Sequence, residues 1–174
     1  PPALREVVSA EYSPELQLAV LGLEAAALEE PVLDLGCGPE ARLVRFLRQA
    51  GKQARGVDRL VEPAPGLLRA DWLEVPLPPG CLGTLLSHLG FSLHFLHHHL
   101  RPGDGALRYA RRYMELLQTL RPGGVFAYAP GLPFVEEHLD PAAWQVERTP
   151  VPVPEGRAPL SIPWYSSRVR RLGR

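Results

Sequence analysis

The sequence predicts an α/β fold with a doubly wound, mostly parallel seven-stranded sheet that ends in an antiparallel C-terminal edge hairpin. Short apolar segments alternate with segments whose apolar residues recur at helical spacing, a pattern typical of parallel strands joined by crossover helices. Segment 32–35 runs directly into two glycines, as a buried strand does where it turns into a helix. Two final extended segments, 144–153 and 162–169, have no helix between them, so we expect them to pair as an antiparallel hairpin.

The N-terminal elements are expected to begin with a helix. Ser13 followed by Pro14 marks its start, because a capping hydroxyl and a proline at the first helical position both favour a helix N-terminus. Apolar residues at helical spacing continue to residue 27, and Pro31 ends the helix. The pattern then predicts a strand at 32–35, a helix at 40–50, a strand at 53–58 and a short strand at 67–71.

The second half continues the alternation. We expect a strand at 82–88, a helix at 91–100, a strand at 125–129 and a short helix at 133–139. Asp104 is a candidate cap for the clearest helix of the chain, which 121–124 would stop. The apolar face of this helix is predicted from spacing alone and comprises Leu107, Ala110, Met114, Leu117 and Leu120.

Length and composition favour one domain and exclude several classes of protein. The chain has 174 residues, enough for one domain with a buried core, and its zero net charge gives no general argument for nucleic acid. Cys37 and Cys81 are too few for a disulfide framework, so a reducing, cytoplasmic setting is expected. No apolar run approaches the roughly 18 residues of a membrane span, so we expect no membrane association.

Residue usage predicts a thermophilic source or a GC-rich genome. Lys52 is the one lysine among nineteen basic residues, asparagine does not occur, and proline occurs twenty times. Loop prolines and few thermolabile amides suit a thermophile. The bias concerns the source of the chain and not its activity.

A glycine turn and two acids are the main functional signal. Asp34 lies in the strand that precedes Gly36 and Gly38, and Asp58 ends the next strand, twenty residues after the second glycine. Glycines allow a sharp turn and a close approach of backbone to ligand, and a following helix offers free N–H groups. An acid at this distance is typical of a group that binds ribose hydroxyls. The pattern predicts a pocket for a nucleoside-bearing cofactor.

Together these segments resemble the class I S-adenosylmethionine-dependent methyltransferases, a Rossmann-like family. The terminal hairpin also matches that family's sheet edge. One departure is 62–66, a short Pro/Gly stretch where the family has a crossover helix, which leaves one wall of the adenine pocket in doubt. The matching segments lie within residues 32–130, a range of more than half of the chain, and are 32–38, 56–58, 70–72, 86–88 and 120–125.

The resemblance implies roles for residues of the first two strands. Gly36, Cys37 and Gly38 would lie against the methionine part of S-adenosylmethionine. Asp34 would help to position the amino group of the cofactor. Asp58 would bind both ribose hydroxyls.

The resemblance also implies roles for residues at the next strand ends. Asp71 would accept a hydrogen bond from the adenine amino group, and Trp72 would lie alongside the adenine ring. Arg59, directly after the ribose-binding acid, belongs to the same predicted cofactor site. Ser87 and His88, at the end of the fourth strand, would face the methyl group.

Each of these residues also has an ordinary structural interpretation. A glycine turn is often only a tight connection, Asp58 can be a turn residue, and Trp72 can belong to the core. The spacing Gly36-x-Gly38-x-x-Ala41 with Asp58 also fits a dinucleotide fingerprint, so an NAD-dependent oxidoreductase is an alternative. The chain has no room for a separate substrate domain, and the acid inside the strand suits the methyltransferase pattern better.

The histidines and the C-terminal arginines are two further candidate sites. His94, His97 and His98 share one face of a helix, but no acid accompanies them, so we expect a polar surface and no metal. The arginines of the terminus could bind RNA, or they could form the exposed face of an edge strand. They are Arg168, Arg170, Arg171 and Arg174.

The predicted function is methyl transfer from S-adenosylmethionine to a small-molecule acceptor. Tyr12 and His88 are the titratable groups expected nearest the methyl, as candidate catalytic residues. The Asn-Pro-Pro-Tyr motif of amino-directed nucleic-acid methyltransferases is absent, because 87–90 reads Ser-His-Leu-Gly. The alternatives are an RNA or protein methyltransferase that uses the arginine-rich end and a non-catalytic cofactor-binding module.

We expect one methyltransferase domain over 1–174. Within it, 1–30 would form an N-terminal helical cover, 31–130 the cofactor-binding core and 131–174 the C-terminal hairpin. The cover is short, which favours either an open pocket or completion of the site by a partner subunit, so a homodimer is possible.

Overall fold

A single sheet organises the computed structural model, which describes residues 12–151 and 164–173. Within this part of the chain seven strands occur in the order β3-β2-β1-β4-β5-β7-β6. The five strands from β3 to β5 are parallel, and β7 runs antiparallel to both of its neighbours. The expected fold class is confirmed. The strands are β1 (Val32–Leu35), β2 (Ala54–Asp58), β3 (Leu67–Arg69), β4 (Leu82–His88), β5 (Leu120–Ala129), β6 (Trp144–Pro150) and β7 (Tyr165–Arg171).

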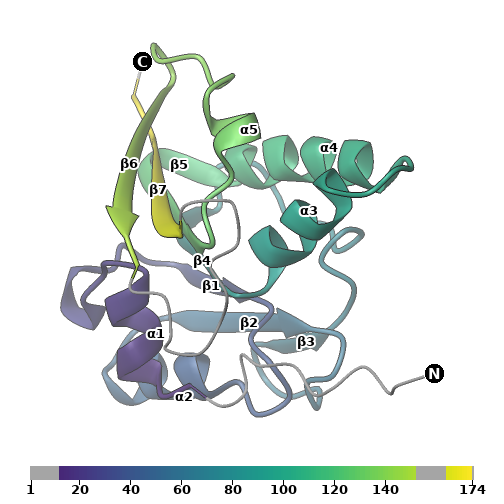
Figure 1. The fold of residues 1–174 in the computed structure, drawn as a ribbon. Coiled ribbons are helices and arrows are strands. Elements are labelled where there is room, and N and C mark those ends of the chain that lie inside the picture. The colour runs from purple at the N-terminus through teal and green to yellow at the C-terminus, as the bar shows by residue number, and fades with distance from the viewer. Residues whose placement is uncertain (1–11, 152–163, 174) are drawn as a thin grey trace.

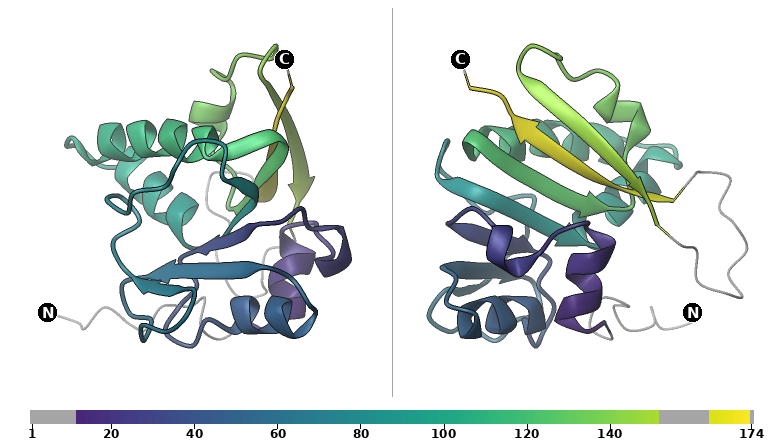
Figure 2. Two further views of the ribbon diagram at one scale, coloured as in Figure 1. Left: turned by 180° about the vertical axis from the view of Figure 1, so that it is seen from behind. Right: turned by 90° about the vertical axis from the view of Figure 1, so that its left-hand side faces the viewer.

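Helices cover the two faces of the sheet (Figures 1 and 2). One face carries α3 (Phe91–His99), α4 (Gly105–Gln118) and the short α5 (Pro133–Glu136) over an aromatic-rich core. The other face carries α1 (Pro14–Val20) and α2 (Arg42–Gln49) over a core of aliphatic residues. Because both faces are covered, the central strand β4 is buried at every position.

Helix α1 begins as predicted but ends earlier. The Ser13 hydroxyl accepts a hydrogen bond from the Leu16 amide at 3.2 Å, as an N-cap does. The helix stops at Val20 rather than near Pro31, and a 3-10 turn, Ala25–Ala27, follows. Gly22 adopts φ +66°, and the Leu23 amide donates to the Leu18 carbonyl, which closes a Schellman turn. Apolar spacing alone does not reveal this stop signal.

The buried face of α4 differs from the predicted one. Leu107 and Met114 are 54% and 41% exposed, whereas Tyr109 and Tyr113 point into the core. Tyr109 stacks on Phe95 with ring centroids 5.7 Å apart, so aromatic packing sets the rotation of the helix. Leu117 and Leu120 are buried as expected.

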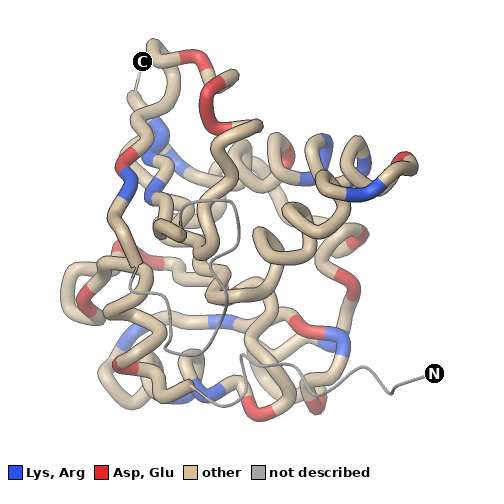
Figure 3. The backbone as a smooth tube through the Cα atoms, in the orientation of Figure 1, with Lys and Arg blue, Asp and Glu red and all other residues tan. Residues whose placement is uncertain are grey.

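Other boundaries shift modestly. Strand β5 begins at Leu120, so 121–124 lies inside the strand, and its pairing with β4 is irregular near Thr84. No helix forms between β2 and β3 in the structure, in agreement with the short 62–66 segment. The predicted hairpin residues 152–153 and 162–163 lie outside the described residues. Lys and Arg are distributed over the hairpin, α4 and the region around α2 (Figure 3).

A buried carboxylate joins α5 to the hairpin. The Glu136 side chain is fully buried, and its two oxygens accept five hydrogen bonds. Burial alone would raise the pKa of Glu136, but the hydrogen bonds, led by that from Ser167, outweigh burial and lower it. The donors are the Leu132 amide, the hydroxyls of Tyr128, Ser167 and Tyr165, and Arg148 Nε.

We predict that Glu136→Gln lowers the free energy of unfolding by about 3 kcal/mol, because an amide cannot accept all five hydrogen bonds and leaves donors unsatisfied. Urea denaturation at neutral pH measures this loss. The exposed neighbour Glu137 provides the matched control, since Glu137→Gln should change stability by less than about 0.5 kcal/mol. Equal stability of the two variants would show that the network contributes nothing.

Candidate functional site

The glycine turn between β1 and α2 leaves open space above its backbone. Gly36 and Gly38 have φ of +89° and +72°, values that side chains rarely allow. A Cβ at Gly36 would lie 3.0 Å from the Trp72 ring, so glycine permits the close approach of that ring. Nothing lies within 4 Å of a Cβ built at Gly38, so this part of the turn faces free space.

Two buried acids lie at this turn. Asp34 and Asp58 are 3% and 8% exposed. One oxygen of Asp58 accepts a hydrogen bond from the Gly38 amide at 3.0 Å, and the other accepts from the Leu60 amide at 2.7 Å. Asp58 therefore fixes the turn while its carboxylate keeps free lone pairs.

The two acids of the turn disfavour ionisation of Asp34. Burial, and after it the nearby charge of Asp58, together raise the pKa of Asp34 to about 7. Burial and the same two acids also raise the pKa of the Cys37 thiol. Within the described residues no ion pair joins Asp34 or Asp58 to a basic side chain. A positively charged ligand would supply the missing partner.

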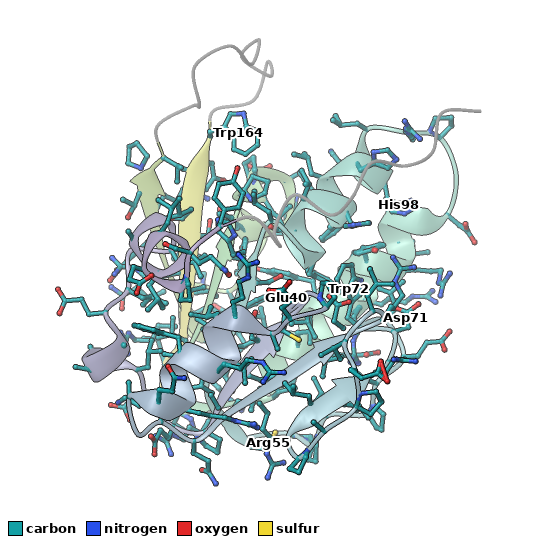
Figure 4. The ribbon with its side chains drawn as sticks, turned by 90° about the horizontal axis from the view of Figure 1, so that it is seen from below. Glu40, Arg55, Asp71, Trp72, His98 and Trp164 are labelled. Carbon is teal, nitrogen blue, oxygen red and sulfur yellow. The ribbon has the colours of Figure 1, made fainter. Side chains whose placement is uncertain are left out.

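A cavity of about 300 Å³ adjoins the loop that follows β3. Asp71, Trp72 and Arg59 contribute to its wall, together with His98 of α3 and Tyr109 of α4. Figure 4 shows Asp71 and Trp72 next to each other, with His98 on the same side of the molecule. The structure therefore brings three of the predicted cofactor-binding residues to one cavity.

Trp72 is held on several sides. Its Nε1 donates to the Tyr109 hydroxyl at 3.3 Å, and the His94 ring meets it edge-on with centroids 5.1 Å apart. The Arg59 guanidinium lies 5.9 Å from the ring centroid, within range of a cation–π contact. Trp72 is thus both a core residue and a cavity wall.

Asp71 keeps one carboxylate oxygen available. Its Oδ1 accepts a hydrogen bond from the Leu73 amide at 2.9 Å. Its Oδ2 makes no hydrogen bond to any other described residue, although Asp71 lines the cavity. This oxygen can accept a hydrogen bond from a ligand.

Ser87 and His88 end β4 and have different surroundings. The Ser87 hydroxyl donates to the Leu35 carbonyl at 2.8 Å and accepts from the Phe91 amide at 2.9 Å. These hydrogen bonds connect β1 to the start of α3, so the hydroxyl has a structural role. That Ser87 faces the methyl group of the cofactor stays a prediction. His88 lies on the opposite face of the strand.

The two candidate catalytic residues lie together. The rings of Tyr12 and His88 meet edge-on, with centroids 5.2 Å apart. His88 is 3% exposed, and burial lowers its pKa to about 4, so the imidazole is neutral at physiological pH. Its Nδ1 has no hydrogen-bond partner among residues 12–151 and 164–173. Buried polar atoms usually have a hydrogen-bond partner, so this nitrogen is unusual.

Solved structures of other proteins share this arrangement of strands. A methyltransferase dependent on S-adenosylmethionine from Archaeoglobus fulgidus covers 91% of this chain and 94% of its own, with 15% identity and a TM-score of 0.55. The fold is that of the class I methyltransferases. The chain matches no protein-family model and no curated protein sequence.

Two more structures with the methyltransferase fold span almost the whole chain. A protein from Listeria monocytogenes assigned as an S-adenosylmethionine-dependent methyltransferase covers 90% of this chain and 99% of its own, with 13% identity and a TM-score of 0.55. A protein from Streptococcus mutans, in complex with S-adenosylhomocysteine, covers 93% and 99%, with 14% identity and a TM-score of 0.50. At these identities the similarity establishes the fold alone.

The histidines of α3 pack against aromatic rings of neighbouring helices. His98 stacks on Tyr109 with centroids 5.1 Å apart, and His99 stacks on Phe134 at 3.6 Å. In the described part of the chain no group of three or more His, Cys, Asp or Glu side chains is arranged to hold a metal ion. No described helix has the length and apolar character needed to cross a membrane.

The C-terminal arginines bind backbone carbonyls of neighbouring elements. Arg168 Nη1 donates to the Gly22 carbonyl and Arg170 Nη1 to the Gly123 carbonyl, both at 2.8 Å. Arg171 Nη1 donates to the Leu120 carbonyl at 2.6 Å. Arg174 lies outside the described residues. These interactions give the arginines of β7 a structural role.

Sequence reasoning missed Tyr109 and Arg112 of α4. Tyr109 lines the cavity, and Arg112 is buried beneath the loop that carries Trp72. The available signal was an arginine and a tyrosine three residues apart, which share one face of a helix. The predicted face consisted of Leu, Ala and Met residues and included neither of them.

We predict that Asp34→Asn stabilises the ligand-free protein above pH 7. A folded-state pKa of about 7, raised from 3.8, means that the folded protein binds the proton more tightly, so stability falls between these pH values. Asn removes this penalty, which amounts to about 4 kcal/mol at pH 8 for a shift of about three pKa units.

Denaturation curves at pH 5 and pH 8 test this effect. The stability of the wild type should fall relative to the Asn variant as pH rises. Asp104→Asn serves as control, because Asp104 is exposed and its side chain makes no capping hydrogen bond. If Asp34→Asn were less stable than wild type at pH 8, Asp34 would have an ion-pairing partner in the fold.

Proposed function

We propose that this protein binds S-adenosylmethionine and transfers its methyl group to a small-molecule acceptor. The observation that carries the proposal is the pair of buried acids at the glycine turn, of which Asp34 is held at a raised pKa with no basic partner among residues 12–151 and 164–173. The ammonium and sulfonium groups of the cofactor supply positive charge at such a site. Binding a cation offsets the cost of burying the Asp34 carboxylate.

The same two acids argue against a dinucleotide. A dinucleotide places its pyrophosphate at the glycine turn and helix N-terminus. Here Asp34 and Asp58 would repel that anion, and the Gly38 amide already donates to Asp58. The electrostatics of the turn therefore favour a cationic ligand over NAD.

Each predicted residue has a proposed role in holding the cofactor. The free lone pairs of Asp58 would accept hydrogen bonds from the ribose hydroxyls, and Asp71 Oδ2 would accept one from the adenine amino group. Trp72 and Arg59 would form the wall of the adenine pocket. The cavity of about 300 Å³ beside them has room for a purine.

In this reaction the protein would mainly align the methyl donor with the acceptor. The cofactor supplies an activated methyl group on a good leaving group, and transfer is an in-line displacement. Neutral His88 would hold the acceptor by accepting a hydrogen bond at a ring nitrogen, which fixes the distance and angle of attack. Tyr12 would pack over it and exclude water.

Two observations favour a small acceptor over RNA. The described C-terminal arginines are engaged with carbonyl oxygens, and the chain has zero net charge. A surface that binds RNA needs basic groups free to contact phosphates. The absence of the Asn-Pro-Pro-Tyr motif points in the same direction.

We predict that S-adenosylmethionine and S-adenosylhomocysteine raise the melting temperature and that NAD does not. A ligand at one hundred times its Kd stabilises the native state by about 2.7 kcal/mol. Thermal-shift curves with the three ligands measure the effect. Stabilisation by NAD alone would overturn the proposed function.

We also predict that the affinity for S-adenosylhomocysteine decreases as pH falls below about 7, because protonated Asp34 cannot pair with the ligand ammonium. Asp34→Asn should bind at least about ten-fold more weakly at pH 8, and its affinity should lose the pH dependence. Calorimetry across pH 5–8 measures both. A wild-type affinity that is independent of pH would separate Asp34 from the ligand.

Binding of labelled RNA at two salt concentrations tests the choice of acceptor. We expect weak binding at physiological salt, and little change in cofactor affinity when Arg168, Arg170 and Arg171 are replaced by Gln. Phosphate contacts would instead give tight binding that falls steeply with salt and disappears in the triple variant. That outcome would favour a methyltransferase that acts on a macromolecule over one that acts on a small molecule.

A further inference from the structure

A buried arginine of α4 holds the loop that carries Asp71 and Trp72. Arg112 is 8% exposed, and its guanidinium reaches away from solvent. Nε donates to the Trp72 carbonyl at 2.7 Å, and Nη2 donates to the Val75 carbonyl at 2.5 Å. The outer nitrogen, Nη1, pairs with Glu115 at 2.9 Å. One side chain thus binds both ends of segment 72–75.

Burying the Arg112 guanidinium costs free energy, which indicates that the side chain has a specific role. Burying a guanidinium is unfavourable unless its donors are satisfied, and an apolar residue at this core-facing position would avoid the cost. The planar fork of arginine can reach two carbonyls at once, which the single ammonium of lysine cannot do in the same geometry. Arg112 therefore acts as a clamp on the loop.

Tyr109, one helical turn earlier on the same face, holds the ring of the same tryptophan. Its hydroxyl accepts the Trp72 Nε1 hydrogen bond at 3.3 Å. On its other side the Trp72 ring lies against Gly36 of the glycine turn. Helix α4 thus controls both the backbone and the ring of Trp72.

Beyond α4, the loop is supported mainly by packing of Trp72 and Val75 in the core and by few hydrogen bonds from other elements. Its internal hydrogen bonds all converge on Asp71, whose carbonyl accepts from the Glu74 and Val75 amides. No helix stands between β2 and β3 in the described chain, so α4 is the helix that contacts the loop by hydrogen bonds. A shift of this segment would move the Asp71 carboxylate.

We propose that Arg112, together with Tyr109, positions Asp71 and Trp72 so that this end of the cavity selects a purine with a 6-amino group. The inference rests on the proposed cofactor function. Arg112 touches neither cofactor nor acceptor in this scheme and acts through the loop. It is a positioning residue whose loss should change ligand selectivity and not only stability.

Calorimetry with two ligands tests the inference. S-adenosylhomocysteine carries a 6-amino group, whereas S-inosylhomocysteine carries a 6-oxo group and leaves Asp71 without a donor. We expect wild type to prefer the amino ligand about ten-fold or more, because an unpaired buried acceptor is costly. Arg112→Gln should weaken S-adenosylhomocysteine about ten-fold and reduce the preference to about two-fold.

Two further variants sharpen the test. Arg111→Gln is the matched control, since Arg111 is the exposed neighbour on the same helix, and both affinities should stay unchanged. Asp71→Ala removes the proposed acceptor, so combining it with Arg112→Gln should cost less than the sum of the two changes. Additive effects would mean that Arg112 does not act through Asp71.

The outcomes separate the two proposals. Failure of wild type to bind S-adenosylhomocysteine would overturn the proposed function. Binding by wild type with an unchanged ten-fold preference in Arg112→Gln, or equal weakening of both ligands, would overturn the positioning role alone. If Arg112→Gln does not fold, Arg112→Lys and Tyr109→Phe are measured instead, and an unchanged preference in both overturns it equally.

Discussion

The burial of two carboxylates at one glycine turn is the constraint on which the rest of the site depends. Asp58 is satisfied by backbone amides, but Asp34 is buried beside it with a pKa raised to about 7. The ligand-free fold carries this unfavourable charge in the centre of its sheet. Such a cost is common at binding sites, where stability is given up for function. In the proposed site this charge would favour a positively charged ligand over a phosphate.

The two faces of the sheet contribute differently to this site. On the α1 side, Tyr12 and His88 form an aromatic pair at the end of β4. On the α4 side, Tyr109 and Arg112 hold Trp72 against the glycine turn. The site therefore depends on elements that lie on opposite sides of the sheet.

Local pattern in the sequence predicted the strands and the glycine turn, because both depend on short apolar runs and on glycines at fixed spacing. It failed for the end of α1, where Gly22 closes a Schellman turn against continuing apolar spacing. It also failed for α4, where two tyrosines are buried in preference to Leu107 and Met114. The Arg112 clamp joins residues about forty positions apart, so no local pattern records it.

The hydrogen bonds from arginines to carbonyl oxygens bear on how the protein responds to salt. Arg168, Arg170 and Arg171 attach the C-terminal strand to Gly22, Gly123 and Leu120 through neutral acceptors. Screening by salt weakens attraction between opposite charges at a surface far more than it weakens a directed hydrogen bond to a dipole. These three attachments should consequently tolerate concentrated electrolyte, in which the partly exposed Arg168–Glu147 ion pair between β6 and β7 should weaken.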